Sequence, residues 1–253
     1  MRKAFHSARG AIAAVVFALI FASGTAYADQ FSLAGLSDPT NVTADVNFVY
    51  TPTNATSGTL TITITNTSSI ASSIRGFAFN LPGSPFSFTS IGGDTDPGGP
   101  TAISAANAGG VSGYFIDLDF DKIGADATGD YDVGVLNTNT GNFINGGAGG
   151  SNPQIAQGQS RTFTLAVVGS NLGSLTTANF LNTLSSGNAP NGNQFFVARF
   201  QAVDNQFGSD FAVPTDGVQQ VIPEPSSIIL MGLGVVGFLG CRARWRRRQS
   251  TAA

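Results

Sequence analysis

The clearest signal in the chain is a regular alternation of hydrophobic and polar residues, the pattern of strands with one buried face. In residues 42–50 every second residue is apolar, and in residues 59–65 threonines alternate with Leu60, Ile62 and Ile64. The turn-forming stretch 52–58 lies between these two segments, which predicts that they pair as a hairpin. Residues 74–81 form a third run, with Phe77 and Phe79 on one face.

Further apolar or alternating runs follow, separated by loops rich in glycine, asparagine and aspartate. They lie at residues 86–88, 114–120, 131–136, 161–168, 195–203 and 211–213, with glycine-rich loops at 92–110 and 141–150 and one short helix at 175–184. About eight to ten strands joined by loops predict an all-β fold, which we expect to be an antiparallel β-sandwich.

Residues 1–28 have the layout of a secretory signal peptide. Arg2, Lys3 and Arg9 precede an apolar run, and Ala26 and Ala28 place small residues at a cleavage point before residue 29. The apolar run has about 12 residues, whereas a membrane-spanning helix needs about 20, which favours a cleaved signal over a permanent anchor. We therefore expect a β-sandwich ectodomain over residues 29–221.

The other end of the chain combines three elements in order at residues 222–248. Two prolines keep the first element, Pro223-Glu224-Pro225, extended. The uncharged apolar segment 226–241 is predicted to form a single transmembrane helix, because a backbone in lipid must satisfy its own hydrogen bonds. A basic cluster within 242–248 then keeps the C-terminus in the cytoplasm. Its members are Arg242, Arg244, Arg246, Arg247 and Arg248.

These three elements resemble the PEP-CTERM sorting domain of Gram-negative bacteria, in which the same elements follow one another. The resemblance implies an exported protein that is held transiently in the inner membrane and handled by an exosortase, a membrane cysteine transpeptidase. It also implies a bacterium that makes exopolysaccharide and biofilm. An ordinary single-pass membrane protein has a similar layout, and the Pro-Glu-Pro motif favours the sorting signal.

Composition restricts what the ectodomain can do. The segment from Asp29 to Pro225 contains all fifteen acidic residues of the chain and only four basic ones, which gives it a net charge of −11. Because such a segment repels the phosphate backbone, we expect no nucleic-acid partner. His6, Cys241 and Glu224 are each the single residue of their type, and none lies within residues 29–221. Ser-His-Asp and Cys-His catalysis and zinc sites built on His or Cys are thereby excluded. We expect a protein without enzymatic activity, and an aspartate-dependent hydrolase is the alternative.

Three aspartates in one predicted strand are the candidate metal ligands. Asp117, Asp119 and Asp121 are predicted to share one face of the strand, with Ile116, Leu118 and Phe120 on the opposite, core-facing side. Same-face residues lie about 6.7 Å apart, so one straight strand offers at most two ligands to calcium. A calcium site would need the following loop, which carries Asp126, Asp130 and Asp132. The alternative is a solvated outer face, and no other cofactor is expected.

The four threonines at positions 59, 61, 63 and 65 form a regular row of hydroxyl and methyl groups. Such a row either docks a repeating surface, such as a polysaccharide, or reflects the high strand propensity of threonine on an exposed face.

Together these patterns predict an exported, non-enzymatic protein of the cell surface or extracellular matrix, sorted by an exosortase through its tail. The expected partners are the exosortase, the membrane and exopolysaccharide. The alternatives are a secreted hydrolase that uses aspartates and a calcium-stabilised adhesin on a permanent single-pass anchor.

Overall fold

The computed structural model describes residues 28–37, 41–95, 99–125, 128–139, 152–203, 208–215 and 219–221 of the 253-residue chain. The predicted signal peptide lies outside these residues except for Ala28, and the sorting tail at 222–248 and the glycine-rich loop at 141–150 lie wholly outside them. Within the described ranges, no helix has the length and apolar character needed to span a membrane.

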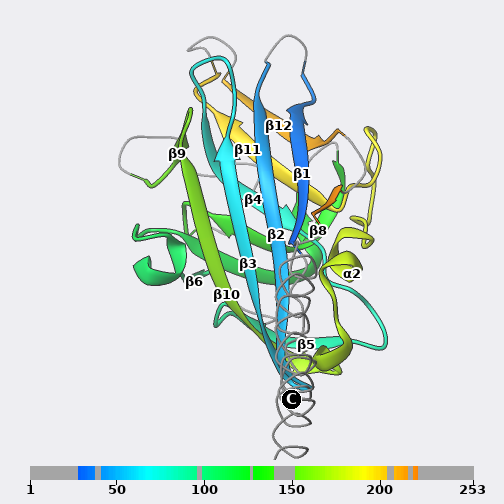
Figure 1. Cartoon of the computed structure of the whole chain (residues 1–253). Helices are drawn as coiled ribbons and strands as arrows, with labels where there is room; N and C mark the ends of the chain where they lie inside the picture. Colours follow the sequence, from blue (N-terminus) through cyan, green and yellow to red (C-terminus); the bar gives the residue numbers. More distant parts are fainter. Residues whose placement is uncertain are drawn as a thin grey trace, which may run out of the picture. The chain divides into compact units, whose positions relative to one another are not determined.

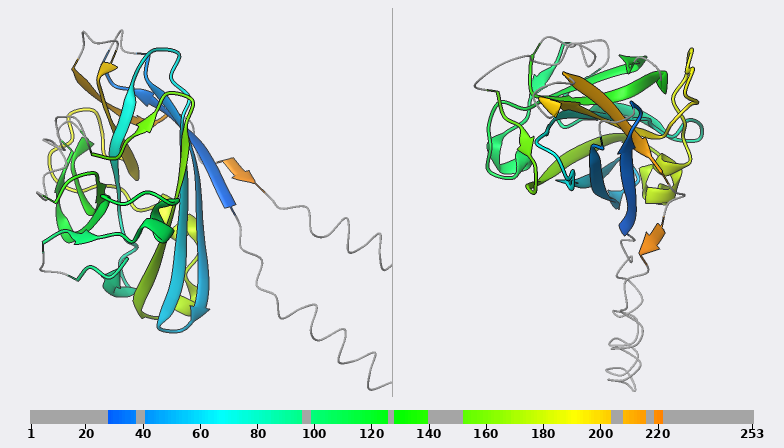
Figure 2. Two further views of the ribbon diagram at one scale, coloured as in Figure 1. Left: turned by 90° about the vertical axis from the view of Figure 1, so that its left-hand side faces the viewer. Right: turned by 90° about the horizontal axis from the view of Figure 1, so that it is seen from above.

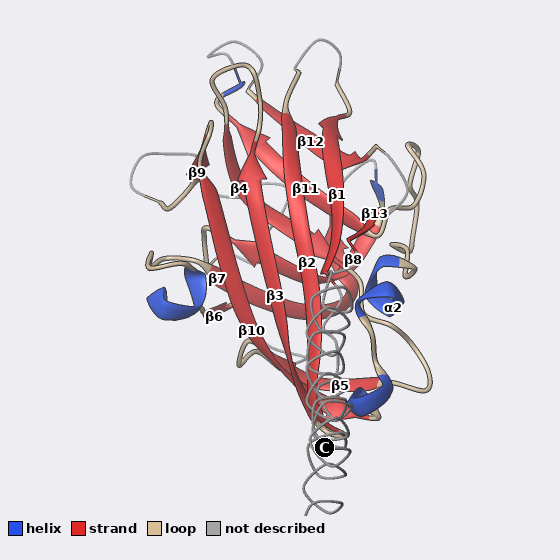
Figure 3. Ribbon diagram, viewed as in Figure 1, coloured by secondary structure: helices blue, strands red, loops and turns tan. Residues whose placement is uncertain are grey.

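Strands make up most of the described chain, and the helices are short (Figure 3). The strands are β1 (Ala28–Gly35), β2 (Thr43–Asn54), β3 (Ser57–Asn66), β4 (Ser73–Phe79), β5 (Ser87–Ile91), β6 (Thr101–Ala102), β7 (Phe115–Gly124), β8 (Asp130–Leu136), β9 (Ile155–Ala156), β10 (Ser160–Ser170), β11 (Phe196–Gln201), β12 (Ser209–Pro214) and β13 (Gln219–Val221). The helical elements are η1 (Ala105–Ala108), η3 (Leu172–Ser174) and α2 (Thr177–Leu181).

All strands belong to one sheet, in the order β5-β10-β3-β2-β1-β12-β11-β4-β8-β7-β6, with β9 paired to β4 and β13 to β1. The pairings with a defined register are all antiparallel, which confirms the predicted antiparallel arrangement of the strands. The long strands β10, β3, β2 and β1 run side by side in front in Figure 1, and the sheet curls so that β4, β8 and β7 lie behind them (Figures 1 and 2).

The predicted sandwich of two separate sheets is not confirmed. β1 and β12 pair with each other and so join the two halves of the sheet, β5-β10-β3-β2 and β11-β4-β8-β7-β6. β1 pairs with β2 along one edge, Phe31 opposite Val46, and with β12 along the other, Leu33 opposite Pro214. The sequence pattern did not predict a strand at residues 28–35. Without that strand, β2 and β12 have no common neighbour, and the halves are expected to be separate sheets.

The core fills the concave side of the curled sheet and is built from the residues that alternate inward. Phe77 of β4 meets Phe163 of β10 edge to face, with ring centroids 5.1 Å apart, and stacks on Phe196 of β11 at 5.4 Å. Phe48 of β2 and Phe79 of β4 make a similar contact at 5.6 Å. These contacts connect the front strands with those behind them, so burial of the aromatic rings favours the curled form of the sheet.

The predicted hairpin is confirmed, with Tyr50 opposite Leu60 in the β2–β3 pairing. The predicted partnership of segments 114–120 and 131–136 is also confirmed as β7 and β8, and the predicted helix is reduced to α2.

Candidate functional site

An irregularity in β7 shapes the region of the predicted metal ligands. Leu118 pairs with Val133 and Ile123 with Tyr131, so residues 119–122 lie opposite a single residue, Asp132. Asp121 adopts a left-handed backbone conformation with φ 54°, which aspartate tolerates better than most residues. The bulge ends the regular alternation of β7, as extra residues in one strand do.

The expectation of three aspartates on one face of a regular strand is therefore wrong. Asp117 is only 5% exposed, Asp119 forms an ion pair with Lys122 at 2.6 Å, and Asp121 lies exposed in the bulge. Phe120, expected in the core, is 36% exposed, because the bulge turns it outward.

Within the described ranges, no three acidic, histidine or cysteine side chains come close enough together to hold a metal ion. Asp126 lies outside those ranges. The backbone of Asp130 exchanges two hydrogen bonds of 2.9 Å with Ser186, which holds this residue in a local bridge. Calcium binding by this region stays a prediction.

Burial, the largest cause, together with the nearby charges of Asp94 and Asp119 raises the pKa of Asp117 from 3.8 to about 6. The buried Asp94 accepts hydrogen bonds from the backbone N–H of Leu118 at 2.6 Å and from the Thr101 hydroxyl at 2.7 Å. Asp117 thus carries its charge at neutral pH in an unfavourable environment.

This shift predicts how stability depends on pH. Because the folded-state pKa lies above the unfolded value, the folded protein holds the Asp117 proton more tightly between about pH 4 and 6. Stability is therefore lost as the pH rises through this window. We expect Asp117→Asn to stabilise the protein by about 1–2 kcal/mol at pH 7.5 and to have little effect below pH 4. Urea unfolding of both forms at the two pH values measures the difference, and an equal effect at both would contradict the assignment.

Asp132 connects two segments through its carboxylate. One oxygen accepts the backbone N–H of Leu81 at 2.8 Å, and the other accepts that of Asp121 at 2.9 Å. Burial raises the pKa of Asp132, these two hydrogen bonds lower it in part, and the charge of Asp121 raises it. The carboxylate fixes the β7 bulge against the chain that leaves β4.

An open cleft of about 470 Å³ lies over this junction. Its apolar wall includes Phe86, Phe120 and Leu184, and its polar groups include Asn80, Asp121 and Asp132. Phe120 and Leu184, at 36% and 55%, are two of the three large hydrophobic residues that are exposed among the described ones. No lysine or arginine lines the cleft. A concave site that combines exposed apolar groups with a few polar ones is the usual form of a small-molecule or saccharide site.

The cleft was not predictable from the sequence. The pattern placed Phe86 and Phe120 in strands as core residues, and nothing in residues 175–184 indicated that Leu184 would be exposed beside them. The signal that pointed to this region was the density of aspartates around position 120.

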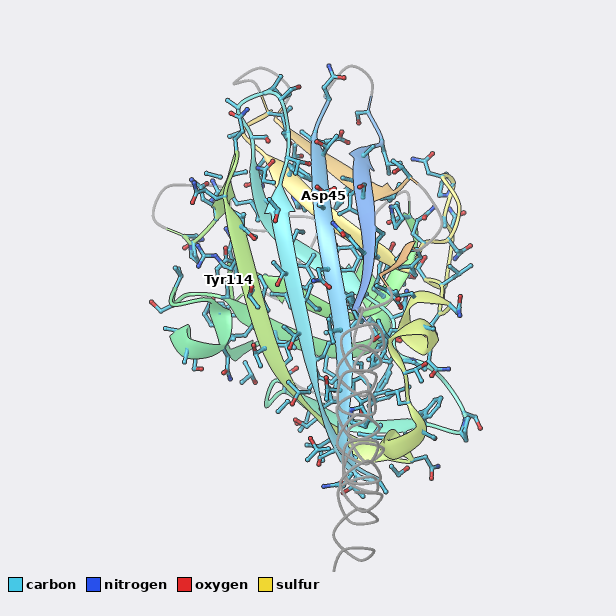
Figure 4. All side chains as sticks on the ribbon, viewed as in Figure 1. Asp45 and Tyr114 are labelled. Carbon is cyan, nitrogen blue, oxygen red and sulfur yellow. The ribbon has the colours of Figure 1, made fainter. Side chains whose placement is uncertain are left out.

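The row of alternating threonines lies on the outer face of the front strands, on β3 between β2 and β10. Figure 4 labels Asp45, which lies on β2 of this face. Two hydroxyls of the row bond a side chain on β10, Thr63 with Thr162 at 2.8 Å and Thr65 with Ser160 at 3.0 Å, and on the same face Ser32 donates to the Asp45 carboxylate at 2.7 Å. These cross-strand pairs stabilise the sheet itself, which favours a structural role for the row, and its docking of a repeating surface stays a prediction.

The described chain is thus an antiparallel β domain with an open, acidic, partly aromatic cleft. Comparison with protein families adds the class of its C-terminal region: residues 221–248 match the PEP-CTERM protein-sorting motif. No curated protein and no solved structure matches the chain. The match contains the Pro-Glu-Pro motif, the apolar segment and the arginines. The chain therefore carries a PEP-CTERM sorting tail, the mark of an exported protein that an exosortase processes.

Proposed function

We propose that this chain is an exported, non-enzymatic protein of the cell surface or extracellular matrix that binds exopolysaccharide through the cleft around Phe120. The sorting tail supports the route of export. In the proposed sequence of events, the tail halts in the inner membrane with its arginines in the cytoplasm, and the exosortase then releases the ectodomain to the surface.

The lining of the cleft supports a saccharide as the ligand. Sugar rings present apolar C–H faces that pack on aromatic rings, and their hydroxyls bond carboxylates and amides. The cleft offers both kinds of group, in Phe86 and Phe120 and in Asn80, Asp121 and Asp132. Two carboxylates and no lining cation favour a neutral or amino sugar over an acidic one.

The composition of residues 29–221 supports the absence of catalysis, since it lacks histidine, cysteine and glutamate. One observation favours the alternative, a hydrolase that uses aspartates: Asp121 and Asp132 share the cleft, and the pKa of Asp132 is raised. Against it, both oxygens of Asp132 already accept backbone hydrogen bonds that hold the bulge in place.

Replacing Phe120 tests the proposed binding site. We expect Phe120→Ala to weaken binding to exopolysaccharide purified from the producing bacterium about tenfold, the loss of one stacking contact worth about 1.4 kcal/mol. Co-sedimentation of the full chain with the polysaccharide measures this. The matched control is Val168→Ala, which removes another exposed hydrophobic side chain, 43% exposed, that does not line the cleft.

Binding by Phe120→Ala that equals that of the wild type would contradict the site. Shortening of the polysaccharide during incubation, abolished by Asp132→Asn, would instead favour the hydrolase.

A further inference from the structure

Two of the four bases in the acidic ectodomain, Arg75 and Arg161, gather around one tyrosine. Arg161 of β10 lies over the ring of Tyr114, its Cζ 5.7 Å from the ring centroid. Tyr114, labelled in Figure 4, is buried, and the charges of both Arg161 and Arg75 act on its hydroxyl. Burial raises the pKa of Tyr114, and the two guanidiniums lower it in part. One buried guanidinium, that of Arg75, and one partly exposed guanidinium, that of Arg161, thus lie near the same tyrosine in a domain of net negative charge.

The strand register explains why these residues meet. Gly76 of β4 pairs with Leu136 of β8, and Leu136 pairs with Phe115 of β7 on its other side. In this register the next position along the three strands holds Arg75, Asn137 and Tyr114 in a row. Arg161 comes from β10 on the opposite side of the curled sheet, where Phe163 packs edge to face on the Tyr114 ring at 5.0 Å.

Several polar atoms of this cluster lack partners among the described residues. Nε and Nη1 of Arg75 and Nε of Arg161 are buried and make no hydrogen bond there. The buried hydroxyl of Tyr114 lies against the Arg161 guanidinium, whose charge and hydrogen bonding lower in part the pKa of the phenol that burial raises. The Arg75 residue is only 9% exposed, and burial lowers the pKa of its guanidinium. Neither arginine is paired with a carboxylate in the described ranges; Arg161 donates instead to the carbonyl of Ala108 at 3.2 Å. A buried, unpaired guanidinium is strongly unfavourable, because its lost hydration is not replaced.

Asn137 adds an acceptor to the cluster of donors. Its side-chain nitrogen donates to the carbonyl of Pro153 at 3.1 Å, which fixes the orientation of the amide. Its side-chain oxygen is then buried without a partner among the described residues. The cluster therefore lacks one anionic acceptor for the guanidiniums and the phenol, and one donor for the Asn137 oxygen.

We propose that Arg75, Tyr114 and Arg161 form a binding site for a single oxyanion, a carboxylate or sulfate group. Two guanidiniums and a phenol match the acceptors of such a group, and in a sugar acid a hydroxyl beside the carboxylate would match the Asn137 oxygen. The oxyanion comes either from a free small ion or from a sugar acid on a saccharide. The site shares no residue with the lining of the Phe120 cleft and does not depend on saccharide binding there.

The test is a calorimetric titration of the full chain in detergent with sodium glucuronate, acetate and sulfate, against chloride at the same ionic strength. The wild type is expected to bind one oxyanion and to gain thermal stability from it. Arg75→Met, which keeps the bulk and removes the charge, is expected to bind at least tenfold more weakly. Tyr114→Phe, which removes one hydroxyl, is expected to bind several-fold more weakly and gives a second test should Arg75→Met fold poorly.

The matched control is Arg199→Met, since Arg199 is also a buried arginine, 8% exposed, but lies on β11 against Phe211. This variant is expected to bind as the wild type does. A preference of tenfold or more for glucuronate would identify a sugar acid as the source, and equal binding of all three would identify a free ion. Unchanged binding in both Arg75→Met and Tyr114→Phe, or binding of none of the three anions at millimolar concentration, would overturn the proposal.

Discussion

Phe77→Ala is expected to destabilise the domain by about 3–5 kcal/mol, the usual effect of removing a phenylalanine from a well-packed core. Phe77 is fully buried, and its ring contacts Phe163 on the front strand β10 and Phe196 on the neighbouring β11. Its removal leaves a cavity where the two sides of the curled sheet meet. Because a domain is stable by only about 5–15 kcal/mol, the melting temperature should fall by about 10 °C or more.

Thermal and urea unfolding of the full chain measure this effect. Phe120→Ala makes the same chemical change at an exposed position and is expected to shift stability by less than about 1 kcal/mol. Equal destabilisation by the two substitutions would contradict the core as described.

Replacing Pro223, Glu224 and Pro225 together by alanine is expected to abolish sorting. The match to the sorting motif begins at residue 221, and these three residues distinguish the tail from an ordinary membrane anchor. The apolar segment and the arginines that follow remain in this variant, so the protein should still reach the membrane. It is then expected to accumulate there unprocessed, with at least tenfold less protein at the cell surface, as fractionation and immunoblotting would reveal.

The matched control replaces Gln249, Ser250 and Thr251, which follow the matched region, by alanine. That variant should be sorted as the wild type is. Normal surface display of the variant that lacks the Pro-Glu-Pro residues would remove the role assigned to the motif.

The long strands were predictable because their alternation is local. The threonine-rich strand β3 and its partner β2 each carry enough inward residues to define one buried face, and a turn joins them directly. β1 was not predictable in the same way: it contains the buried Asp29, and its pairing with β12 joins residues about 180 positions apart, a contact that no local pattern encodes. The difference between a sandwich and one curled sheet depends on that single strand.

In the candidate site, too, the local features were predictable from the sequence and the long-range contacts were not. The sequence located the acidic region, but a regular strand was the simplest interpretation of residues 114–120. The bulge depends on Asp132, which accepts the backbone N–H of Asp121 from across the ladder. The cleft depends on Leu184 and Phe86, which come from distant segments. The cluster at Arg75 likewise arises from the register of three strands and could not be found by spacing along the chain.

The most direct test of the central claim, that an exosortase sorts this protein through its C-terminal tail, is the intact mass of the form isolated from the cell surface. Processing by the exosortase predicts a C-terminus that lies before the arginine cluster, so the mass of residues 242–248 should be missing. A surface form that retains Arg248 would contradict the account.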